Sequence, residues 1–418
     1  MVFAGVIFLI TYLVIVSERV HRTLAALLGG MAMILFGVVS QNDAFGAIDL
    51  NVIFLLAGMM MIAYVMGKSG IFQWMAIQAV RLGRGNTVYI MIILAVITAL
   101  GSALLDNVTI VVLLAPVTLY VATTLNVNPV PLLIAEVMAS NIGGSATLIG
   151  DPPNILIGSA ANISFDAFVL NMGPPALFGL IGGLIVLVLL FRNQLQAPND
   201  RQRVLMDLNT EGLIHDRRLL LQALIVLALV LVGFVFHSWL HIEPATVALT
   251  GAVLLLIWTR QDPVKVLEHV EWTTLFFFVG LFITVEAIVQ AGIIARVADG
   301  LIEITGGDLR VTTYLILWFS ALASGIVDNI PYTAAMIPVV EGLAGTMRLE
   351  PIWWALALGA DFGGNLTLVG ASANIVVASL AERSGHKLNF GEFFRYGFRI
   401  VLTTLSLASL WLWWRYLL

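Results

Sequence analysis

The sequence repeats itself at a distance of 222 residues, and this repeat constrains the fold more than any other feature. The pair Asp-Asn at 106–107 recurs at 328–329. After a slip of two residues, GGSATLIGDPPNI at 143–155 matches GGNLTLVGASANI at 363–375. Other matching positions are Phe54 with Phe276, Gly58 with Gly280, Gly70 with Gly292, and Pro116 with Pro338. Such a repeat predicts two halves of similar structure.

Both halves are too apolar for a soluble domain. Hydrophobic residues make up 60% of the 418 positions and charged residues 11%, whereas soluble domains are about 45–50% apolar and about 25% charged. Apolar segments long enough to cross a bilayer recur along the whole chain. We therefore expect an all-α polytopic membrane protein. The absence of cysteine excludes disulfides and thiolate metal sites, and no metal site is expected.

Ten crossing segments are expected. They are 2–16, 23–39, 51–67, 131–161, 172–190, 219–236, 244–258, 272–290, 352–380 and 400–416. Two further apolar regions, 88–125 and 310–347, carry Asp-Asn at their centres and are interpreted as re-entrant hairpins. Each hairpin enters and leaves on one side, so it does not change the orientation of the following segments.

Basic residues orient this layout. Of the 20 Lys and Arg residues, 16 fall in five connections on one side. These connections are 17–22, 68–86, 191–218, 259–271 and 381–399. Because cytoplasmic loops carry the excess of Lys and Arg, these connections are expected in the cytoplasm and both termini outside.

Each repeat then contains five crossings, an odd number, so the two copies are predicted to be inverted in the membrane. The expected organisation is a first repeat at 1–190 (hairpin 88–125, unwound helix 131–161), a cytoplasmic basic linker at 191–218, and a second repeat at 219–418 (hairpin 310–347, unwound helix 352–380). Inverted repeats with broken helices are typical of secondary transporters, whose substrate site lies near the bilayer midplane.

The segment at 141–158, NIGGSATLIGDPPNILIG, is polar in the middle of an apolar region. Gly150 allows a turn, and Pro152 and Pro153 lack the N–H donors that would continue a helix. Non-helical backbone at this depth is tolerated only inside protein or beside a water-filled cavity. We expect the break, matched at Gly370, to expose backbone groups that bind a solute. A proline kink used only for packing is the alternative.

The two Asp-Asn pairs place a carboxylate in apolar surroundings. A charge at the bilayer centre costs at least about 2.5–3.5 kcal/mol, so Asp106 and Asp328 are candidates for a functional site. Their oxygens and those of the neighbouring amides could coordinate a cation or accept hydrogen bonds from a hydroxylated solute. Alternatively, each Asp caps the N-terminus of the following half-helix, and both roles can coexist.

Acids present in only one repeat are better placed to couple transport to protons. They are Asp151, Asp361, Glu136 and Glu286, opposite Ala371, Asn141, Leu356 and Tyr64. Asp151 and Asp361 lie beside the glycine-rich stretches, and a desolvated carboxylate there can exchange protons near neutral pH. Glu136 is a further proton-coupling candidate, although for Glu136 and Glu286 a structural pairing is favoured.

At these residues the sequence resembles a known family. LLDNVTIVVLLAPVTL (104–119) and LIAEVMASNIGGSATLIGDPPNILI (133–157) closely resemble the permeases named for the P (pink-eyed dilution) melanosomal protein, which are grouped with arsenite efflux permeases in the ion transporter superfamily. The resemblance covers nearly the whole chain. It implies two inverted five-helix repeats, each with a re-entrant hairpin and an unwound helix, an elevator-like motion, and a scaffold that often supports a homodimer.

The resemblance also implies binding roles at the hairpin tips and along both unwound helices. The expected substrate- or ion-binding residues are Asp106, Asn107, Thr109, Thr147, Gly150, Asn154, Asp328, Asn329, Thr367, Gly370 and Asn374. Related symporters carry Ser-Asn-Thr at the tips, and the added acids argue against a di- or tricarboxylate substrate. A long luminal N-terminal region is not found, which favours the plasma (inner) membrane of a prokaryote.

Three functions remain open: arsenite efflux against protons, sodium–proton antiport, and symport of an anion or organic solute. Arsenite at neutral pH is an uncharged trihydroxide, suited to Asp, Asn, Thr and backbone acceptors. The resemblance favours arsenite, whereas the chemistry of the expected site favours neither arsenite nor sodium over the other. An anion is disfavoured by the acids and by the lack of any basic residue at the expected site.

An enzyme is not expected. The chain has no GxxxxGK[ST] motif and no soluble domain for ATP hydrolysis, so a proton or sodium gradient rather than a cofactor is the expected driving force. Docking of a partner ATPase on the linker 191–218 is an alternative that the sequence leaves open. The expected partners are the lipid bilayer, the small solute and protons, and no nucleic acid.

Overall fold

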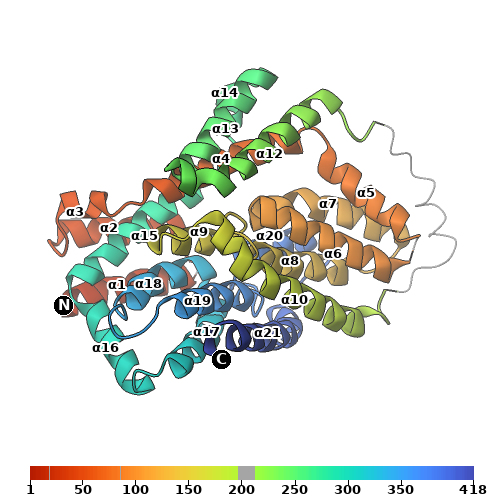
Figure 1. Cartoon of the computed structure of the whole chain (residues 1–418). Helices are drawn as coiled ribbons and strands as arrows, with labels where there is room; N and C mark the ends of the chain where they lie inside the picture. The colour runs from red at the N-terminus through yellow and green to blue at the C-terminus, as the bar shows by residue number, and fades with distance from the viewer. Residues whose placement is uncertain (18, 85, 196–211) are drawn as a thin grey trace.

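The computed structural model describes residues 1–17, 19–84, 86–195 and 212–418, and within these ranges the chain forms helices and turns without strands (Figure 1). The helices of the first half are α1 (Val2–Ser17), α2 (Arg22–Leu35), α3 (Gln41–Gly46), α4 (Leu50–Gly67), α5 (Ile71–Leu82), α6 (Thr87–Leu104), α7 (Asn107–Leu125), α8 (Val130–Gly144), α9 (Pro152–Ala160) and α10 (Phe165–Phe191). The expected all-α fold is confirmed.

The second half repeats this order of elements. Its helices are α12 (Arg217–Leu240), α13 (Pro244–Thr259), α14 (Pro263–Leu267), α15 (Trp272–Gln290), α16 (Ile293–Thr305), α17 (Leu309–Val327), α18 (Asn329–Glu341), α19 (Glu350–Gly363), α20 (Ser372–Arg383) and α21 (Phe390–Leu412), followed by a π-helical turn at Trp413–Leu417. Most of the predicted linker at 191–218, including Arg201 and Arg203, lies outside the described residues.

The spacing of the repeat carries over to the helices. The helices α4 and α15 begin 222 residues apart, as do α6 and α17, and α7 and α18. A short helix precedes α4 and another precedes α15, so even small elements recur. The sequence repeat therefore corresponds to a repeat of structure. The inversion of the two copies in the membrane stays a prediction.

Glycines allow the two halves to pack across each other. The helix α2 packs against α15, and α4 packs against α13, in both cases joining one half to the other (Figure 1). A Cβ atom added at Gly280 would lie 2.4 Å from the backbone carbon of Ala26, and one added at Gly58 would lie 2.8 Å from that of Ala248. Small residues permit such close contact of helices in membranes. The matched glycines of the sequence are thus the contact points of two equivalent interfaces.

Each hairpin lies against the broken helix of its own half. The helices α6 and α7 meet at 105–106 and pack against α8, and α17 and α18 meet at 327–328 and pack against α19. Residues 145–151 separate α8 from α9, and residues 364–371 separate α19 from α20. Both breaks lie where the sequence predicts them. The long helices α10 and α21 pack against each other beside this core.

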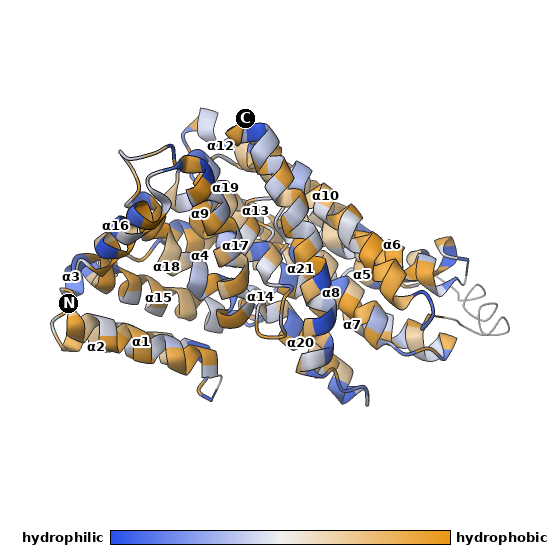
Figure 2. Ribbon diagram, turned by 90° about the horizontal axis from the view of Figure 1, so that it is seen from below, coloured by the Kyte–Doolittle hydropathy of each residue, from blue (hydrophilic) through white to orange (hydrophobic). Residues whose placement is uncertain are grey.

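The outer surface suits a lipid environment. Eight of the described helices have the length and composition to cross a membrane, and Figure 2 shows hydrophobic residues along helices such as α1, α6 and α10. The hairpin arms α6, α7 and α17 are among the eight, with 18 or 19 residues each, or about 27–29 Å. The fourth arm, α18, has 13 residues and is not among the eight. Arm length therefore does not distinguish a re-entrant hairpin from two crossings in the first half, and the number of crossings stays a prediction.

Candidate functional site

The break between α8 and α9 is closed by its own side chains. A Cβ atom at Gly150 would lie 2.5 Å from the carbonyl oxygen of Gly144, so only glycine fits. Asn154 Nδ2 donates hydrogen bonds to the carbonyl oxygens of Gly144 (3.2 Å) and Thr147 (3.1 Å). The Thr147 hydroxyl donates to the carbonyl oxygen of Ala103 in the hairpin, at 2.6 Å.

The second break has the same bonds. Asn374 Nδ2 donates to the carbonyl oxygens of Gly364 (2.7 Å) and Thr367 (2.8 Å). The Thr367 hydroxyl donates to the carbonyl oxygen of Gly325. The expectation that these breaks leave their carbonyl groups free for a solute is therefore wrong for these four carbonyls, because a buried acceptor needs a partner and an asparagine supplies it.

The aspartates at the hairpin tips cap helices, as the alternative interpretation predicts. Asp106 accepts a hydrogen bond from the backbone N–H of Thr109 at 2.8 Å. Asp328, at a φ of 86°, accepts one from the backbone N–H of Ile330 at 3.0 Å. Both side chains are buried, with 8% and 7% of the residue exposed. Each carboxylate keeps further lone pairs that a cap does not use.

Asp151 joins the two hairpin tips. Its carboxylate accepts a hydrogen bond from Asn107 Nδ2 at 2.8 Å and another from Asn329 Nδ2 at 3.2 Å. In addition, the backbone N–H of Asn329 donates to the carbonyl oxygen of Gly370 at 3.2 Å. Asp151, an acid present in only one repeat, thus bonds to both hairpin tips, and Asn329 connects this junction to the second break.

An asparagine network that the sequence analysis missed adjoins this junction, because Asn107 Nδ2 also donates to Asn141 Oδ1 at 3.3 Å. Asn141 Nδ2 donates to Asn365 Oδ1 at 2.9 Å and to Asn374 Oδ1 at 3.0 Å. Asn365 Nδ2 donates to the carbonyl oxygen of Met138. The signal in the sequence is the repeat alignment, in which Asn141 stands opposite Asp361.

Asp361 occupies the position in the second repeat that Asn141 occupies in the first. Asp361 lies beside Asn154, just as Asn141 lies beside Asn374. Both residues are 0% exposed, and neither the Asp361 carboxylate oxygens nor Asn154 Oδ1 have a hydrogen-bond partner among the described residues. By the repeat, the Asp361 carboxylate corresponds to the Asn141 side chain and Asn154 Oδ1 corresponds to Asn374 Oδ1. A carboxylate oxygen and an amide oxygen are both acceptors, so in that arrangement they can bond only if a proton lies between them.

The remaining acid, Glu136, lies away from the tips. It bonds to the hydroxyl of Thr118, which joins α8 to α7. Its second oxygen, Oε2, has no partner among the described residues. Glu286 accepts a hydrogen bond from Gln290 Nε2 at 2.8 Å. These contacts are the structural pairings that the sequence analysis favoured.

The tips and Asp151 line a small cavity, which we call the aspartate chamber. Its volume is about 20 Å³, and its wall includes Asp106, Asp151 and Asn329. Arg22 also lines it, so the expectation of no basic residue at the site is wrong. The sequence places Arg22 in a cytoplasmic connection, where basic residues are common, whereas the fold brings the first turn of α2 to the hairpin tip.

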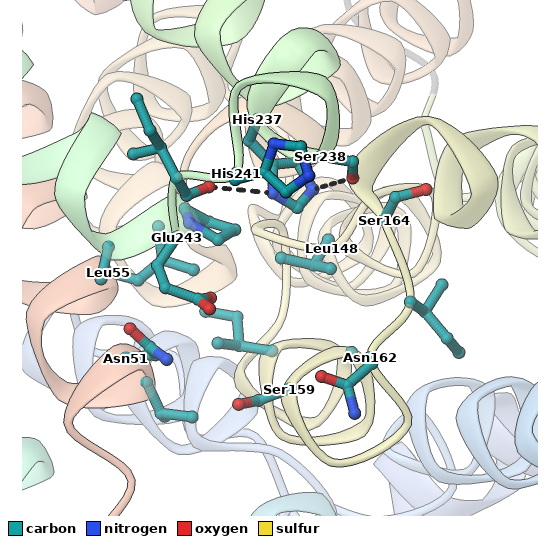
Figure 3. Close-up of a pocket in the computed structure, with 17 residues that line it drawn as sticks. Asn51, Leu55, Leu148, Ser159, Asn162, Ser164, His237, Ser238, His241 and Glu243 are labelled. Carbon is teal, nitrogen blue, oxygen red and sulfur yellow. Dashed lines mark hydrogen bonds between the residues drawn. The ribbon is translucent and has the colours of Figure 1, made fainter.

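Arg22 and Glu271 also line a larger cavity of about 370 Å³, the Arg22 cavity. A second cavity of about 360 Å³, the His237 cavity, lies by the loop between α12 and α13 (Figure 3). Positions that line the two cavities correspond at the repeat distance: Ile15 with His237, His21 with Glu243, Arg22 with Pro244, and Thr273 with Asn51. The two cavities are therefore equivalent by the repeat but differ in chemistry.

His237, which lines the His237 cavity, is held by backbone groups. His237 Nε2 accepts a hydrogen bond from the backbone N–H of Phe165, and its Nδ1 contacts the carbonyl oxygen of Ile242, which Figure 3 shows as a dashed line. In the part of the chain that the structure describes, no group of three or more His, Cys, Asp or Glu side chains could hold a metal ion.

Known proteins share this fold and sequence. Residues 12–359 match the CitMHS family, described as citrate transporters. A Mycobacterium bovis protein described as uncharacterized transporter Mb2703 is 46% identical over 99% of this chain and 98% of its own length. Human P protein is 33% identical over 96% of this chain and 58% of its own length, which confirms the resemblance drawn from the motifs.

Solved structures with a similar fold are transporters. The YdaH transporter of Alcanivorax borkumensis matches 93% of this chain and 89% of its own with a TM-score of 0.63, at 16% identity. MtrF of Neisseria gonorrhoeae matches 91% of this chain and 84% of its own with a TM-score of 0.58, at 12% identity. The family match, the relatives and the helical membrane fold agree: the chain belongs to the CitMHS family and is a multi-pass membrane transporter.

Proposed function

We propose that the protein exports arsenite in exchange for protons, with Asp361 as the proton carrier. The observation that supports this role is the pair of unpartnered acceptors, the Asp361 carboxylate and Asn154 Oδ1. A proton on Asp361 restores the bond that Asn141 makes to Asn374 in the other half. Loss of that proton breaks the bond next to the break at 145–151, which links protonation to the shape of the binding region.

Asp151 is less suited to carry the proton. Both of its oxygens already accept hydrogen bonds from asparagine amides, so a proton added to Asp151 would compete with one of these bonds. Asp151 therefore serves to hold the two hairpin tips together. In this proposal Asp361 carries the proton and Asp151 positions the tips.

The cargo is inferred from the charges and donors at the aspartate chamber. Asp106, Asp151 and Glu271 line it together with one cation, Arg22. Free citrate, the solute in the family description, carries carboxylates that these acids would repel. Arsenite is uncharged and offers hydroxyl donors to acceptors, so it suits this chamber and the adjoining Arg22 cavity better than a carboxylate does.

Sodium–proton antiport is the second candidate, because of the size and charge of the chamber. Asp106 makes neither of the two ion pairs found among the described residues. A cavity of about 20 Å³ has room for about one water-sized ligand. A bare sodium ion held by Asp106 and Asp151 would fit such a space, whereas arsenite would need the tips to part.

Flux in proteoliposomes decides between these cargoes. Purified protein is reconstituted with a pH-sensitive dye inside, a pH gradient is imposed, and arsenite, sodium or citrate is added in separate samples. We expect proton movement with arsenite above that of protein-free vesicles. Proton movement with sodium alone would assign the second candidate, and movement with citrate alone would contradict the charge argument.

A further inference from the structure

We infer that Arg22 is the specificity-determining residue that makes the site reject monovalent cations. Its guanidinium occupies the cation position formed by Asp328 and Ser372, so a free cation must displace it before binding there. The inference rests on the proposed function, because it explains why an acidic site would carry an uncharged hydroxylated cargo.

The contacts of Arg22 fix its head group at the hairpin tip. Arg22 Nη1 lies 3.3 Å from Asp328 Oδ2 and also donates to the hydroxyl oxygen of Ser372. Ser372 in turn donates to Asp328 Oδ2 at 3.3 Å. The guanidinium carbon lies 5.3 Å from the ring centre of Phe277, a distance typical of a cation–π contact. One carboxylate oxygen, one hydroxyl and one aromatic face thus surround a single positive charge.

Arg22 is also accessible to the transport route. It lines both the aspartate chamber and the Arg22 cavity, and 28% of its side chain is exposed. Asp328 and Ser372 line the Arg22 cavity as well, so a cation in that cavity meets a carboxylate that is already paired with the guanidinium. Arg22 belongs to α2, whereas Asp328 and Ser372 belong to the hairpin and the broken helix of the other half, so the ion pair connects parts of the chain far apart in sequence.

The repeat shows that only one half has an arginine at this position. The position equivalent to Arg22 is Pro244, and the position equivalent to Ser372 is Pro152. Asp106, the counterpart of Asp328, has the same capping role without either partner. A helix cap alone therefore does not require an arginine. The ion pair is specific to one tip, as expected for a residue that selects the cargo rather than one that maintains the fold.

The test compares cation uptake in full-length variants. R22Q removes the charge, R22K keeps it, and R19Q removes a charge three residues earlier on an exposed side chain outside the cavity. Uptake of radioactive sodium and of arsenite is measured in parallel in proteoliposomes. We expect R22Q to take up sodium about tenfold faster than the wild type, because loss of the guanidinium removes one positive charge that compensates Asp328 at the cavity wall. R22K keeps a positive charge at the tip and should take up sodium more slowly than R22Q, and R19Q should match the wild type.

A double variant shows whether the gain acts through the proposed position. The sodium uptake gained by R22Q should be lost again in R22Q/D328N. Sodium uptake by R22Q at the wild-type rate, or a gain that persists in R22Q/D328N, would overturn the inference. If R22Q is poorly folded, R22M is used instead, and the shift of its melting temperature by sodium chloride relative to choline chloride reports cation binding without flux.

The outcome also separates this inference from the proposed cargo. If the wild type moves neither arsenite nor sodium and R22Q gains sodium uptake, the role of Arg22 holds and the arsenite assignment fails. If the wild type moves arsenite and R22Q gains no sodium uptake or sodium-dependent stabilisation, the arsenite assignment holds and the role of Arg22 fails.

Discussion

At the scale of single residues, several positions of the site occur twice, once in each repeat. The two members of such a pair differ in their side chain or in the side chains that surround them. Asn141 donates to Asn374, whereas Asp361, at the position equivalent to Asn141, has no amide group to donate to Asn154. Asp106 caps a helix alone, whereas Asp328 does so with Arg22 and Ser372 beside it. The differences between equivalent positions therefore carry the proposed chemistry.

The two hairpin aspartates should respond differently to the same substitution. D106N keeps a residue that caps helices well, so its melting temperature should stay near that of the wild type while arsenite flux falls at least about tenfold through loss of a charged acceptor. D328N should lose flux and also melt at a lower temperature, because Arg22 would lose its carboxylate partner. Thermal denaturation in detergent and flux in vesicles check both effects. Normal flux in both variants would contradict a site at the hairpin tips.

At the scale of helices, stability depends on the crossed contacts between the halves. We expect G280A to destabilise the protein, because its Cβ would lie 2.4 Å from the backbone of Ala26 and overpacking costs about 1–3 kcal/mol. G300A is the matched control, since nothing lies within 4 Å of a Cβ at that position in α16. Its melting temperature should be unchanged or raised. Equal melting temperatures for the two variants would show that the α2–α15 contact is looser than described.

The elements themselves could be predicted from the sequence to a large extent. Apolar segments, the Asp-Asn pairs and the glycine–proline break indicate the helices, the hairpin tips and both breaks. What could not be predicted is how elements of different halves meet. The positions of Arg22 and Ser372 next to Asp328 follow from packing of α2 against the second half, and no local pattern in the sequence reports that contact.

At the scale of the whole molecule, two equivalent cavities lie beside one set of buried polar groups. The charge bias of the loops predicts that the connection at 17–22, beside the Arg22 cavity, faces the cytoplasm and that the loop beside the His237 cavity faces outside. The Arg22 cavity shares lining residues with the aspartate chamber, among them Arg22 and Glu271, whereas the His237 cavity shares none. This arrangement suits an alternating pathway with the His237 cavity as its second end. The homodimer and a partner ATPase stay predictions.

The variant D361N tests whether Asp361 couples transport to protons. Its amide can donate to Asn154 Oδ1 as Asn141 donates to Asn374, so the variant should fold and remain fixed in the equivalent of the protonated form. The matched control E286Q alters an acid already paired with Gln290 and should behave as the wild type.

The measurement is internal pH in proteoliposomes after arsenite addition, together with arsenite counterflow at equal pH. The wild type and E286Q should move protons when arsenite is added. D361N should exchange arsenite for arsenite but move no protons. Proton movement by D361N at the wild-type rate would show that Asp361 does not carry the proton.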